Sequence, residues 1–466
     1  MAETMNRRNF IKAAARSTAG AGLAASALGV PRPVAASDKV RVGVIGTGGE
    51  GRNVMSDFLK QPDVDVVAVC DVYRPNLDQA LKDTGGKAKD YKDFREVLDR
   101  KDIDAVLIAS PDHWHALQTV LACQSGKDVY VEKPIANCIE ECRRMVEAAR
   151  KHNRVVQVGT EWRSNAHFQK GVELIHDGLI GKVSFVRTWN YLNLFPDGYG
   201  NYEDSEPPAN LDWDLWLGPA PKAPFNWNRF GVKWQMPGSW VSPQANWSTF
   251  RYFWDYAGGW MTDWGIHFIN VIHWAMKVDG PHAAVASGGK WYLQDNTETP
   301  DTLLVSLEYP GFLATYENRL CNQNSKHAIH EYVGNDPDLL RDWGMQFHGS
   351  NGTLTLDQTG VQVNPETRSS GQKQVDRTPA MEMTGFEEVY GPHVRNFVDC
   401  IKSRQRPVSD IEIGQRATNS CHLANIAYRT QSRVGWDPAS QTPVQPGPEV
   451  RKLLSVAYRS PWTMVI

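Results

Sequence analysis

The sequence lacks an excess of charge of either sign. Among its 466 residues, 50 are Lys or Arg and 53 are Asp or Glu, which gives a formal net charge of −3 at pH 7. No long block of one sign interrupts this balance, so the basic surface typical of nucleic-acid-binding proteins is not indicated. The hydrophobic content of 41% excludes disorder of the chain as a whole.

Paired cysteines and long apolar runs are also missing. The seven cysteines are scattered, odd in number and without a Cys-x-x-Cys pair, so neither a disulfide framework nor a zinc finger is indicated. No run approaches the roughly 20 apolar residues that span a bilayer, and stable insertion into a membrane is not expected. No internal repeat is visible. We expect a globular protein of two domains with an extra lobe.

The first residues resemble an export signal and not part of the fold. An Arg-Arg pair (Arg7 and Arg8) precedes a weakly apolar Ala/Gly-rich run at 13–30 and a small-residue site near Ala36. This pattern resembles a twin-arginine signal peptide over residues 1–36, and the alternative is an N-terminal helix outside the fold. We therefore expect a periplasmic or otherwise exported protein, carried by the twin-arginine machinery.

A glycine-rich turn opens the folded part of the chain. Residues 40–46 form a β-branched run typical of a buried parallel strand, and Gly-Thr-Gly-Gly-Glu-Gly follows before a helical stretch. In this G-x-G-x-x-G motif the first glycine permits a tight turn, the second lets the backbone approach a pyrophosphate, and the third allows close packing of helix on strand. The residues expected at the phosphates are Gly46, Thr47, Gly48, Gly49 and Gly51.

An acidic residue ends the second predicted strand. The run from 64 to 70 is followed by Asp71, which lies 20 residues beyond Gly51. A carboxylate at that distance binds the ribose hydroxyls of adenosine and disfavours the 2′-phosphate of NADP. Arg74 is a competing signal, because an arginine just past the acid can accommodate that phosphate. The cofactor is therefore NAD or NADP, with NAD favoured by Asp71.

Strands and helices alternate up to residue 158. The predicted elements are helices at 94–100, 116–125 and 139–152 and strands at 105–109, 128–131 and 155–158. This rhythm predicts an α/β fold with a doubly wound parallel sheet over residues 37–159, whose ligands bind at the carboxyl ends of the strands. Those ends carry polar motifs at 110–115, 132–134 and 159–163.

The rhythm changes after residue 158, and we predict a second domain over residues 160–442. Its predicted elements are helices at 166–177, 387–403 and 411–432 and strands at 182–191, 283–291, 302–309, 312–318, 327–333 and 352–356. The polar stretch at 361–379 is expected to be a surface excursion. The proline-interrupted tail at 443–466 is expected to wrap back over the body.

Tryptophan is concentrated in one part of this second domain. Ten of the 17 tryptophans fall between residues 189 and 264, without a helical or strand period. They either pack a loop-rich lobe or stack on the apolar faces of a pyranose. We expect at least two of them to face a substrate.

Three residues are candidates for chemistry. Lys133 follows a strand end and precedes a proline, where a partly desolvated lysine can have a lowered pKa and relay protons. Asp263 and His267 are spaced four apart, so in one helix with Thr262 as its cap they would share a face. The alternative interpretations are a solvated loop lysine and a core histidine.

Together these motifs resemble the Gfo/Idh/MocA family (glucose–fructose oxidoreductase, inositol dehydrogenase, rhizopine catabolism). The resemblance rests on the glycine loop, Asp71, residues 110–115, Glu-Lys-Pro at 132–134 and the Asp-x-x-x-His pair at 263 and 267, and it runs from about 39 to 462. It is closest to an exported bacterial branch. It implies a Rossmann domain followed by an α+β domain with a large, mostly antiparallel sheet that covers the nicotinamide, and a cis peptide before Pro134.

The resemblance also implies site residues. The catalytic set is Lys133, Asp263 and His267: His267 takes a hydroxyl proton, Lys133 binds the same oxygen, and Asp263 orients the imidazole or the lysine. The implied cofactor residues, besides the glycine loop, are Asp71, Arg74, Ser110, Pro111, His113, His115, Glu132, Lys133 and Arg163. The implied substrate residues are Lys133, Trp162, Trp216, Asp263 and His267.

The leading hypothesis is a homo-oligomeric NAD(P)-dependent oxidoreductase acting on a sugar or cyclic polyol, with the cofactor tightly held because little free NAD(P) exists outside the cytoplasm. One alternative is an NAD-dependent glycosidase that oxidises a sugar transiently and eliminates the glycosidic substituent. Another is a cofactor-dependent sugar-binding protein without catalysis. A metal-binding site formed by His113, His115, Asp263, His267 and His273 is a further alternative. Such a site would require ligands from distant segments to converge, so no metal is expected.

Overall fold

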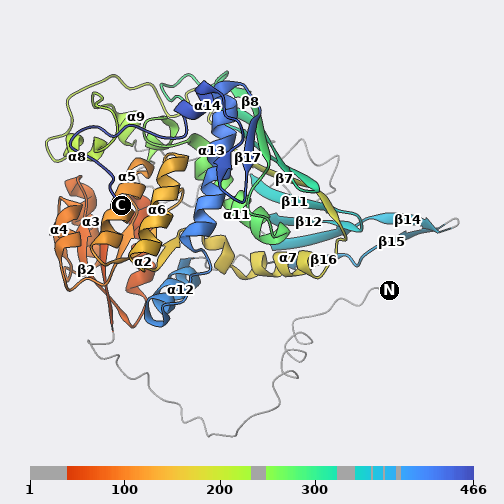
Figure 1. Cartoon of the computed structure of the whole chain (residues 1–466), viewed down its shortest axis with the longest axis horizontal. Coiled ribbons are helices and arrows are strands. Elements are labelled where there is room, and N and C mark those ends of the chain that lie inside the picture. The colour runs from red at the N-terminus through yellow and green to blue at the C-terminus, as the bar shows by residue number, and fades with distance from the viewer. Residues whose placement is uncertain (1–38, 232–247, 323–341, 358–359, 371–372, 385–389) are drawn as a thin grey trace, which may run out of the picture. The chain divides into compact units, whose positions relative to one another are not determined.

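The computed structural model describes residues 39–231, 248–322, 342–357, 360–370, 373–384 and 390–466 (Figure 1). Within these ranges the chain forms a six-stranded sheet, a ten-stranded sheet and a two-stranded ribbon. The predicted class, a parallel nucleotide-binding sheet followed by a large, mostly antiparallel one, is confirmed. The strand predicted at 327–333 lies outside the described residues.

The first sheet is parallel throughout, with the strand order β3-β2-β1-β4-β5-β6. Its strands are β1 (Val40–Ile45), β2 (Val64–Cys70), β3 (Lys89–Tyr91), β4 (Ala105–Ile108), β5 (Asp128–Val131) and β6 (Val156–Val158). β4, β5 and β6 are buried along their whole length, and most of their residues are apolar. The strand order reverses between β1 and β4, and this reversal opens a crevice at their carboxyl ends.

Helices cover both faces of this sheet. They are α2 (Gly49–Leu59), α3 (Arg74–Asp83), α4 (Phe94–Asp99), α5 (Asp112–Gln124) and α6 (Ile139–Lys151). α5 begins four residues before the predicted helix, directly after Pro111. Proline suits this place because its missing N–H would have no partner at a helix start. The motif at 110–115 is therefore mostly helical and not an extended loop.

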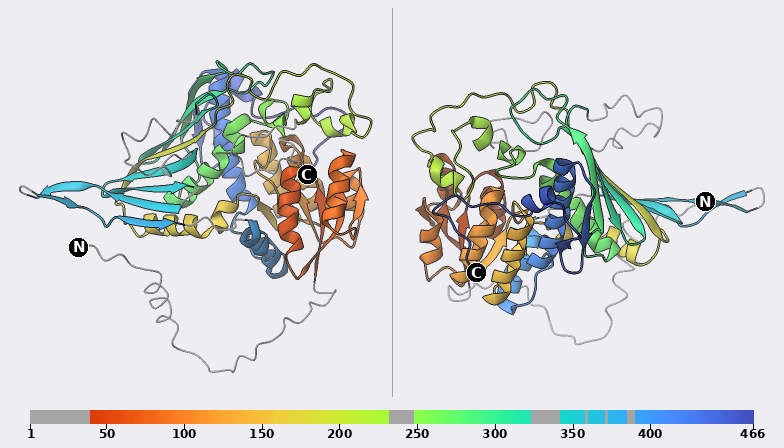
Figure 2. Two further views of the ribbon diagram at one scale, coloured as in Figure 1. Left: turned by 180° about the vertical axis from the view of Figure 1, so that it is seen from behind. Right: turned by 45° about the horizontal axis from the view of Figure 1, so that its top comes forward.

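The second sheet has the order β16-β13-β12-β11-β7-β10-β9-β8-β17-β18 (Figure 2). Its strands are β7 (Val183–Tyr191), β8 (Ala283–Gly289), β9 (Thr302–Tyr309), β10 (Phe312–Arg319), β11 (Trp343–Gly349), β12 (Gly352–Asp357), β13 (Gly360–Pro365), β16 (Met381–Thr384), β17 (Val434–Asp437) and β18 (Thr442–Pro443). β7 and β10 run parallel, and the other neighbouring pairs are antiparallel.

The expectation of a surface excursion at 361–379 is wrong for its first part. β13 is a strand of the large sheet, and Val361 and Val363 are buried in its core. They alternate with polar residues, so the overall polarity of the segment concealed a strand with one buried face. β14 (Thr367–Ser370) and β15 (Lys373–Asp376) form a ribbon that projects from this end of the sheet (Figure 2).

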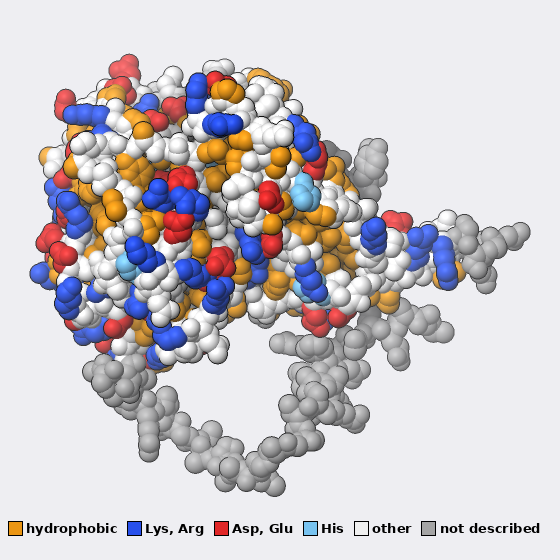
Figure 3. Space-filling model, viewed as in Figure 1, with side chains coloured by type: hydrophobic (Ala, Val, Ile, Leu, Met, Phe, Trp, Pro, Cys, Tyr) orange, Lys and Arg blue, Asp and Glu red, His pale blue; other side chains and the backbone are white. Residues whose placement is uncertain are grey.

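Acidic and basic side chains are interspersed on the face of the molecule drawn in Figure 3. Neither sign dominates that face, in keeping with the near balance of charges in the sequence. None of the described helices combines the length and the apolar character that crossing a bilayer requires.

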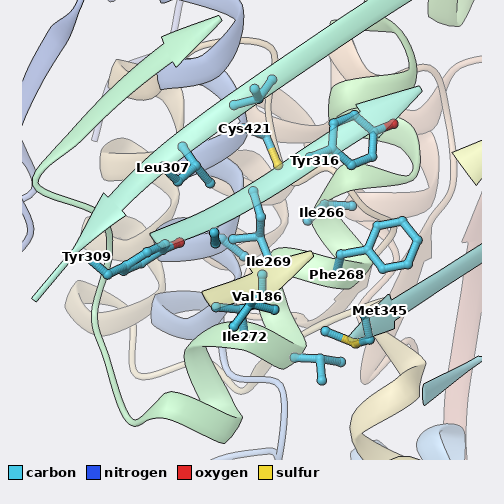
Figure 4. Close-up of a cluster of buried hydrophobic side chains, with 14 of the residues drawn as sticks. Val186, Ile266, Phe268, Ile269, Ile272, Leu307, Tyr309, Tyr316, Met345 and Cys421 are labelled. Atoms are coloured by element: carbon cyan, nitrogen blue, oxygen red, sulfur yellow. The ribbon is translucent and has the colours of Figure 1, made fainter. Parts of the chain in front are cut away.

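Three helices pack against the second sheet and build the main core: α7 (Ala166–His176), α11 (Gly265–Met276) and α13 (Ile411–Thr430). In Figure 4, Ile266, Phe268 and Ile269 of α11 lie against Leu307 and Met345 of the sheet. Burying each such side chain contributes roughly 1.5–3 kcal/mol. The packing fixes α11, and with it His267, which lies between two of these anchors.

The tryptophan-rich lobe has a core of its own. Its described elements are α8 (Trp213–Leu217), α9 (Trp227–Phe230) and the 3-10 turn η3 (Thr249–Tyr252). The rings of Trp213 and Trp216 stack with centroids 4.6 Å apart, and both side chains are buried with Phe225. These rings therefore pack the lobe. Trp234, Trp240 and Trp247 lie outside the described residues.

The C-terminal tail contacts the nucleotide-binding half. After α14 (Pro448–Lys452), the Tyr458 hydroxyl donates to Glu141 Oε1 at 2.6 Å. Arg459 pairs with Asp214 of the lobe at 2.7 Å. The Trp462 ring lies edge-on to Trp114, with centroids 4.8 Å apart. The tail thus bridges the lobe and the helix that begins at the end of β4.

Candidate active site

A pocket lies at the carboxyl end of the first sheet, over the glycine-rich turn. Several residues expected at the cofactor line it: Gly46, Gly48, Gly49, Asp71, Ser110 and Pro111. The lobe supplies another wall, with Trp216, Phe250 and Arg251. Trp216, expected at the substrate, is therefore brought to the nucleotide pocket.

The shape of the turn fits a pyrophosphate. Gly46 has a φ of +86°, and a Cβ there would lie 2.5 Å from the backbone nitrogen of Ser110. A Cβ on Gly51 would lie 2.0 Å from the carbonyl oxygen of Gly46, so the helix and the turn approach closely. A Cβ on Gly49 would meet nothing within 4 Å. Gly48, Gly49 and Glu50 line the pocket, so the start of α2, whose first N–H groups have no helical partner, is where a dinucleotide phosphate would be held.

Asp71, which favours NAD, and Arg74, which could accommodate NADP, lie in different surroundings in the structure. Asp71 lines the pocket, and its Oδ2 accepts hydrogen bonds from the backbone nitrogen and hydroxyl of Thr47 at 2.8 and 3.1 Å. Burial raises the pKa of its carboxyl. Arg74 forms ion pairs with Asp78 at 2.6 Å and Asp90 at 2.8 Å. Among the described residues, Arg74 is not part of the pocket lining.

His113 and His115 contact backbone carbonyl oxygens of loops next to the pocket. His115 Nδ1 lies 2.7 Å from the carbonyl oxygen of Pro134, and its Nε2 lies 2.7 Å from that of Ser110. His113 Nε2 lies 3.1 Å from the carbonyl oxygen of Trp216. Burial lowers the pKa of His113 to about 3 and that of His115 to about 4. Within the described part of the chain, neither imidazole lines the pocket, and both act on the loops around it.

Lys133 and Asp263 meet although 130 residues separate them. The Lys133–Pro134 peptide bond is cis, and Lys133 Nζ lies 2.9 Å from Asp263 Oδ1 and 3.1 Å from its carbonyl oxygen. Burial alone would lower the pKa of Lys133, but the Asp263 carboxylate outweighs it and raises that pKa. The expected lowered pKa is therefore wrong, and Lys133 remains a cation that donates hydrogen bonds.

A second cation shares the same carboxylate. Arg251 Nε lies 3.2 Å from Asp263 Oδ1. Burial would raise the pKa of Asp263, yet the two cations lower it to about 2. Asp263 is thus a permanent anion that orients the lysine. Among the described contacts, no hydrogen bond joins Asp263 to His267.

Asp263 and His267 do not share one helix, contrary to the prediction. α10 (Gly259–Asp263) ends at the aspartate, and α11 begins at Gly265. Glycine weakens a continuous helix, and a Cβ at Gly265 would lie 2.8 Å from Met261 Cε. Thr262 is inside α10 and caps no helix start: its hydroxyl donates to the carbonyl oxygen of Gly259 at 3.2 Å.

His267 is buried against an aromatic ring and faces a carboxyl group. The Trp162 ring stacks on its imidazole with centroids 4.8 Å apart. Its Nδ1 lies 3.8 Å from Glu161 Oε1 of η2 (Glu161–Ser164). Burial, followed by the charge of Lys133, lowers the pKa of His267 well below its ordinary value. The imidazole is therefore neutral and has a lone pair available for a proton.

Arg163 and Glu132, both expected at the cofactor, bind other parts of the protein; Glu132 is buried and Arg163 is partly buried. Arg163 Nε donates to Asn270 Oδ1 at 2.6 Å, and burial lowers its pKa to about 10. Glu132 Oε2 accepts from the backbone nitrogen of Lys133 at 3.1 Å. Burial raises the pKa of Glu132 strongly. Among the described residues, neither lines the nucleotide pocket.

Sequence reasoning assigned no role to three charged residues of the site. Glu161 and Asp112 stand in motifs at strand ends, and their position after a buried strand was an available signal. Burial raises the pKa of each to about 7. Arg251 lies in an irregular stretch far from either motif, and nothing in the sequence pattern points to it.

The histidines weighed as metal ligands are engaged elsewhere. His273 Nε2 lies 3.0 Å from the Tyr309 hydroxyl, and His113 and His115 face backbone carbonyl oxygens. In the described ranges, no three or more His, Cys, Asp or Glu side chains form a group that could hold a metal ion.

Comparison with protein families identifies the fold and its cofactor class. The family described as "Oxidoreductase family, NAD-binding Rossmann fold" matches residues 40–160. Two C-terminal domains of the same family match residues 167–286 and 230–355. The chain belongs to the Gfo/Idh/MocA oxidoreductase family. The two C-terminal matches overlap over residues 230–286, and the three matches together run from 40 to 355.

Curated relatives match over part of their length. A "Glycosyl hydrolase family 109 protein" of Shewanella baltica (strain OS185) is 36% identical over 171 residues, which cover 32% of this chain and 37% of that protein. A protein of the same name from Saccharopolyspora erythraea is 29% identical over 203 residues, covering 39% of this chain and 44% of the relative. The chain thus matches less than half the length of these curated relatives.

Solved structures of similar fold include sugar dehydrogenases. The WlbA dehydrogenase from Bordetella pertussis, in complex with NADH and UDP-GlcNAcA, has a TM-score of 0.61 at 18% identity, covering 86% of this chain and 99% of that chain. Levoglucosan dehydrogenase, in complex with NADH and levoglucosan, has a TM-score of 0.60 at 17% identity, covering 85% and 99%. At these identities the likeness extends to the fold alone.

Proposed function

We propose that this Gfo/Idh/MocA protein is an NAD(P)-dependent oxidoreductase that moves a hydride between a hydroxyl-bearing carbon of a sugar or cyclic polyol and a nicotinamide cofactor. The observation that carries the proposal is the pairing of Lys133 with Asp263 at 2.9 Å, close to a neutral buried His267. Arg251, which lines the nucleotide pocket, contacts the same carboxylate. When bound, the nicotinamide supplies the hydride acceptor.

The protein's own residues handle the substrate hydroxyl. The Lys133 ammonium, oriented by Asp263, donates a hydrogen bond to the substrate oxygen and stabilises negative charge that develops there. The neutral imidazole of His267 takes the hydroxyl proton. Asp263 and His267 are buried and Lys133 is mostly buried, and this limited access of water strengthens these interactions.

The direct test is reduction of the cofactor by substrate. Purified protein, loaded with NAD, is mixed with single sugars and cyclic polyols while the absorbance of reduced nicotinamide is recorded. We expect reduction by at least one member of the panel. A protein that binds the dinucleotide but reduces none of it with any sugar would support the alternative of a sugar-binding protein without catalysis.

A glycosidase that works by transient oxidation is the second candidate, favoured by the names of the curated relatives. In such an enzyme a sugar hydroxyl would be oxidised to a ketone, which acidifies the neighbouring C–H bond. Loss of that proton and of the glycosidic substituent, as an alcohol, would leave an enone. Water would add to this enone, and return of the hydride would restore the hydroxyl. Such an enzyme releases an alcohol from a glycoside without net formation of reduced cofactor. Net reduction that accumulates with turnover favours the dehydrogenase.

Two features of the cofactor site support tightly held NAD. The lobe lines the nucleotide pocket, and Trp462 of the tail packs on Trp114, a pocket residue. Arg74, the residue suited to a 2′-phosphate, is paired with two carboxylates. Mass analysis of the dinucleotide that copurifies, before and after dialysis, tests both identity and retention. Complete loss on dialysis, with activity restored only by millimolar cofactor, would contradict tight binding.

Export and self-association belong to the same proposal. The Arg-Arg pair at positions 7 and 8 is expected to direct twin-arginine export, so replacing both with lysine should leave the protein in the cytoplasm of a bacterial host. A homo-oligomer is expected, and light scattering of the purified protein measures its mass.

A further inference from the structure

His267 has a carboxyl neighbour that the family motif does not supply. The Nδ1 atom of His267 lies 3.8 Å from Glu161 Oε1, and the two side chains are only 9% and 8% exposed. Among the described residues, this Nδ1 has no hydrogen-bond partner. Glu161 comes from η2 at the end of β6, and His267 comes from α11, so two separately anchored elements hold the pair.

Asp263 does not take this place. Its Oδ1 contacts Lys133 Nζ at 2.9 Å and Arg251 Nε at 3.2 Å, and no described ion pair joins it to His267. Glu161 is thus the one carboxylate among the described residues within 4 Å of the imidazole.

Proton uptake by His267 needs such a neighbour. The imidazole is buried, and the Lys133 ammonium acts on it as a like charge, so an imidazolium ion is disfavoured from two causes. A carboxylate facing the other ring nitrogen opposes both effects, because it attracts the new charge inside a site of low dielectric constant.

We propose that Glu161 is a positioning residue for His267, an inference that rests on the proposed oxidoreductase function. The carboxylate keeps the proton of the neutral imidazole on Nδ1, so that Nε2 presents its lone pair to the substrate. In the reaction the substrate O–H bond breaks and an N–H bond forms at Nε2. The electron pair of the C–H bond leaves with the hydride, and the imidazolium ion is held by Glu161.

The charged groups around Glu161 and His267 set the pH range in which hydride transfer is expected to be fast. Glu161 is acted on by Lys133, which favours its ionised form, and by Glu50 and Glu132, which disfavour it; burial raises its pKa to about 7. His267 is acted on by Lys133 and Asp263. The gap of 3.8 Å is longer than a hydrogen bond, and such contacts tighten when substrate binds. Hydride transfer should therefore slow as the pH falls below about 7.

The test compares Glu161→Gln with Glu141→Gln in the NAD-loaded protein. Glu141 is also buried and hydrogen-bonded, to the backbone nitrogen of Asn137 and to Tyr458, but it lies outside the site. For Glu161→Gln we expect roughly 10²-fold slower hydride transfer, little change in KM, and loss of the acid limb of the pH profile. Glu141→Gln should keep the wild-type profile.

A second readout does not depend on turnover. Nitrogen-15 NMR of the histidine ring atoms, with His267 assigned from the spectrum of His267→Gln, reports which nitrogen carries the proton. We expect Nδ1–H in the wild type and a changed ratio of tautomers in Glu161→Gln. A wild-type imidazole protonated at Nε2, or an unchanged rate and pH profile in Glu161→Gln, would overturn the inference. If no sugar reduces the cofactor, the oxidoreductase proposal fails, and the NMR result still decides the pairing.

Discussion

Two buried carboxyl groups near His267 differ in their neighbours and therefore in charge. Asp263 contacts Lys133 and Arg251 at 2.9 and 3.2 Å, and these cations lower its pKa to about 2 despite burial. Glu161 has the imidazole at 3.8 Å as its ion-pair neighbour, and burial raises its pKa to about 7. The comparison shows that nearby cations, and not burial itself, decide which carboxyl group is ionised.

In the proposed reaction this difference separates two tasks within one site. On the side of Asp263, a fixed anion would hold Lys133 and Arg251 in place for a substrate oxygen. On the side of Glu161, a carboxyl group with a pKa of about 7 would face the residue proposed to exchange a proton. Pairs of carboxyl groups whose pKa values are pushed apart are typical of acid–base sites.

The largest expected effect comes from replacing His267, the proposed base. His267→Ala should slow hydride transfer by roughly 10³-fold, because no other described side chain replaces the base. The affinity for NAD should stay unchanged, since His267 does not line the nucleotide pocket. Stopped-flow absorbance measures the first effect and calorimetric titration the second. Wild-type turnover in this variant would remove His267 from the mechanism.

Removing the Asp263 carboxylate should lower the stability of the protein as well as its activity. Asp263→Asn leaves Lys133 and Arg251 buried without their counter-ion, and such a loss costs about 3–5 kcal/mol in the free energy of unfolding. Asp90→Asn is the matched control, because it breaks only the exposed ion pair with Arg74, worth less than about 1 kcal/mol. Urea unfolding measures both. Equal costs for the two variants would contradict the role given to Asp263.

The contributions of Glu161 and Asp263 to the free energy of unfolding should respond to pH in opposite directions. Folding raises the pKa of Glu161 from 4.5 to about 7, so the folded protein holds this proton more tightly, and stability falls as the pH rises through that range. Folding lowers the pKa of Asp263 from 3.8 to about 2, so its contribution is present above pH 3.8 and is lost as the pH falls toward 2.

Glu161→Gln isolates the first of these responses. The variant should flatten the decline in unfolding free energy between about pH 4.5 and 7, by an amount on the order of 3 kcal/mol at most. Denaturant unfolding at a series of pH values measures the slope. A variant whose slope matches that of the wild type would show that Glu161 is ionised without cost in the fold.

The smallest expected effect sharpens the comparison on the cationic side. Arg251→Lys keeps the positive charge but changes its geometry, while Lys133 still holds Asp263. Hydride transfer should slow by less than about tenfold. Steady-state kinetics on the substrate found in the sugar panel measure it. A loss as large as that of His267→Ala would mean that Arg251, and not Lys133, is the main cation of the site.

Much of the nucleotide-binding half of the fold could be predicted from local sequence. β1, β2, β4, β5 and β6 are short, mostly apolar runs with turn residues after them, and the sequence predicted them. β3 reads Lys-Asp-Tyr and was missed, because it has no apolar run to mark it. β13 was missed because its burial depends on tertiary packing, in which Val361 and Val363 join a core. The break between α10 and α11 was missed although Gly265 stands at it.

The site was predictable where a motif marks it and not elsewhere. Lys133, Asp263 and His267 were found from their spacing and their family pattern. Arg251 was not, because its contact with Asp263 joins an irregular turn to a helix end. The environment of Glu161 depends on burial between η2 and α11, which no sequence period reports.

The central claim is that substrate hydride reaches a nicotinamide held beside Lys133, Asp263 and His267. Its most direct test is a single turnover: NAD-loaded protein is mixed with each sugar or polyol, and the absorbance of reduced cofactor is followed in the wild type and in His267→Ala. The account predicts a rise with at least one compound in the wild type and almost none in the variant. Bound NAD that no compound reduces in the wild type, or equal reduction in both proteins, would contradict it.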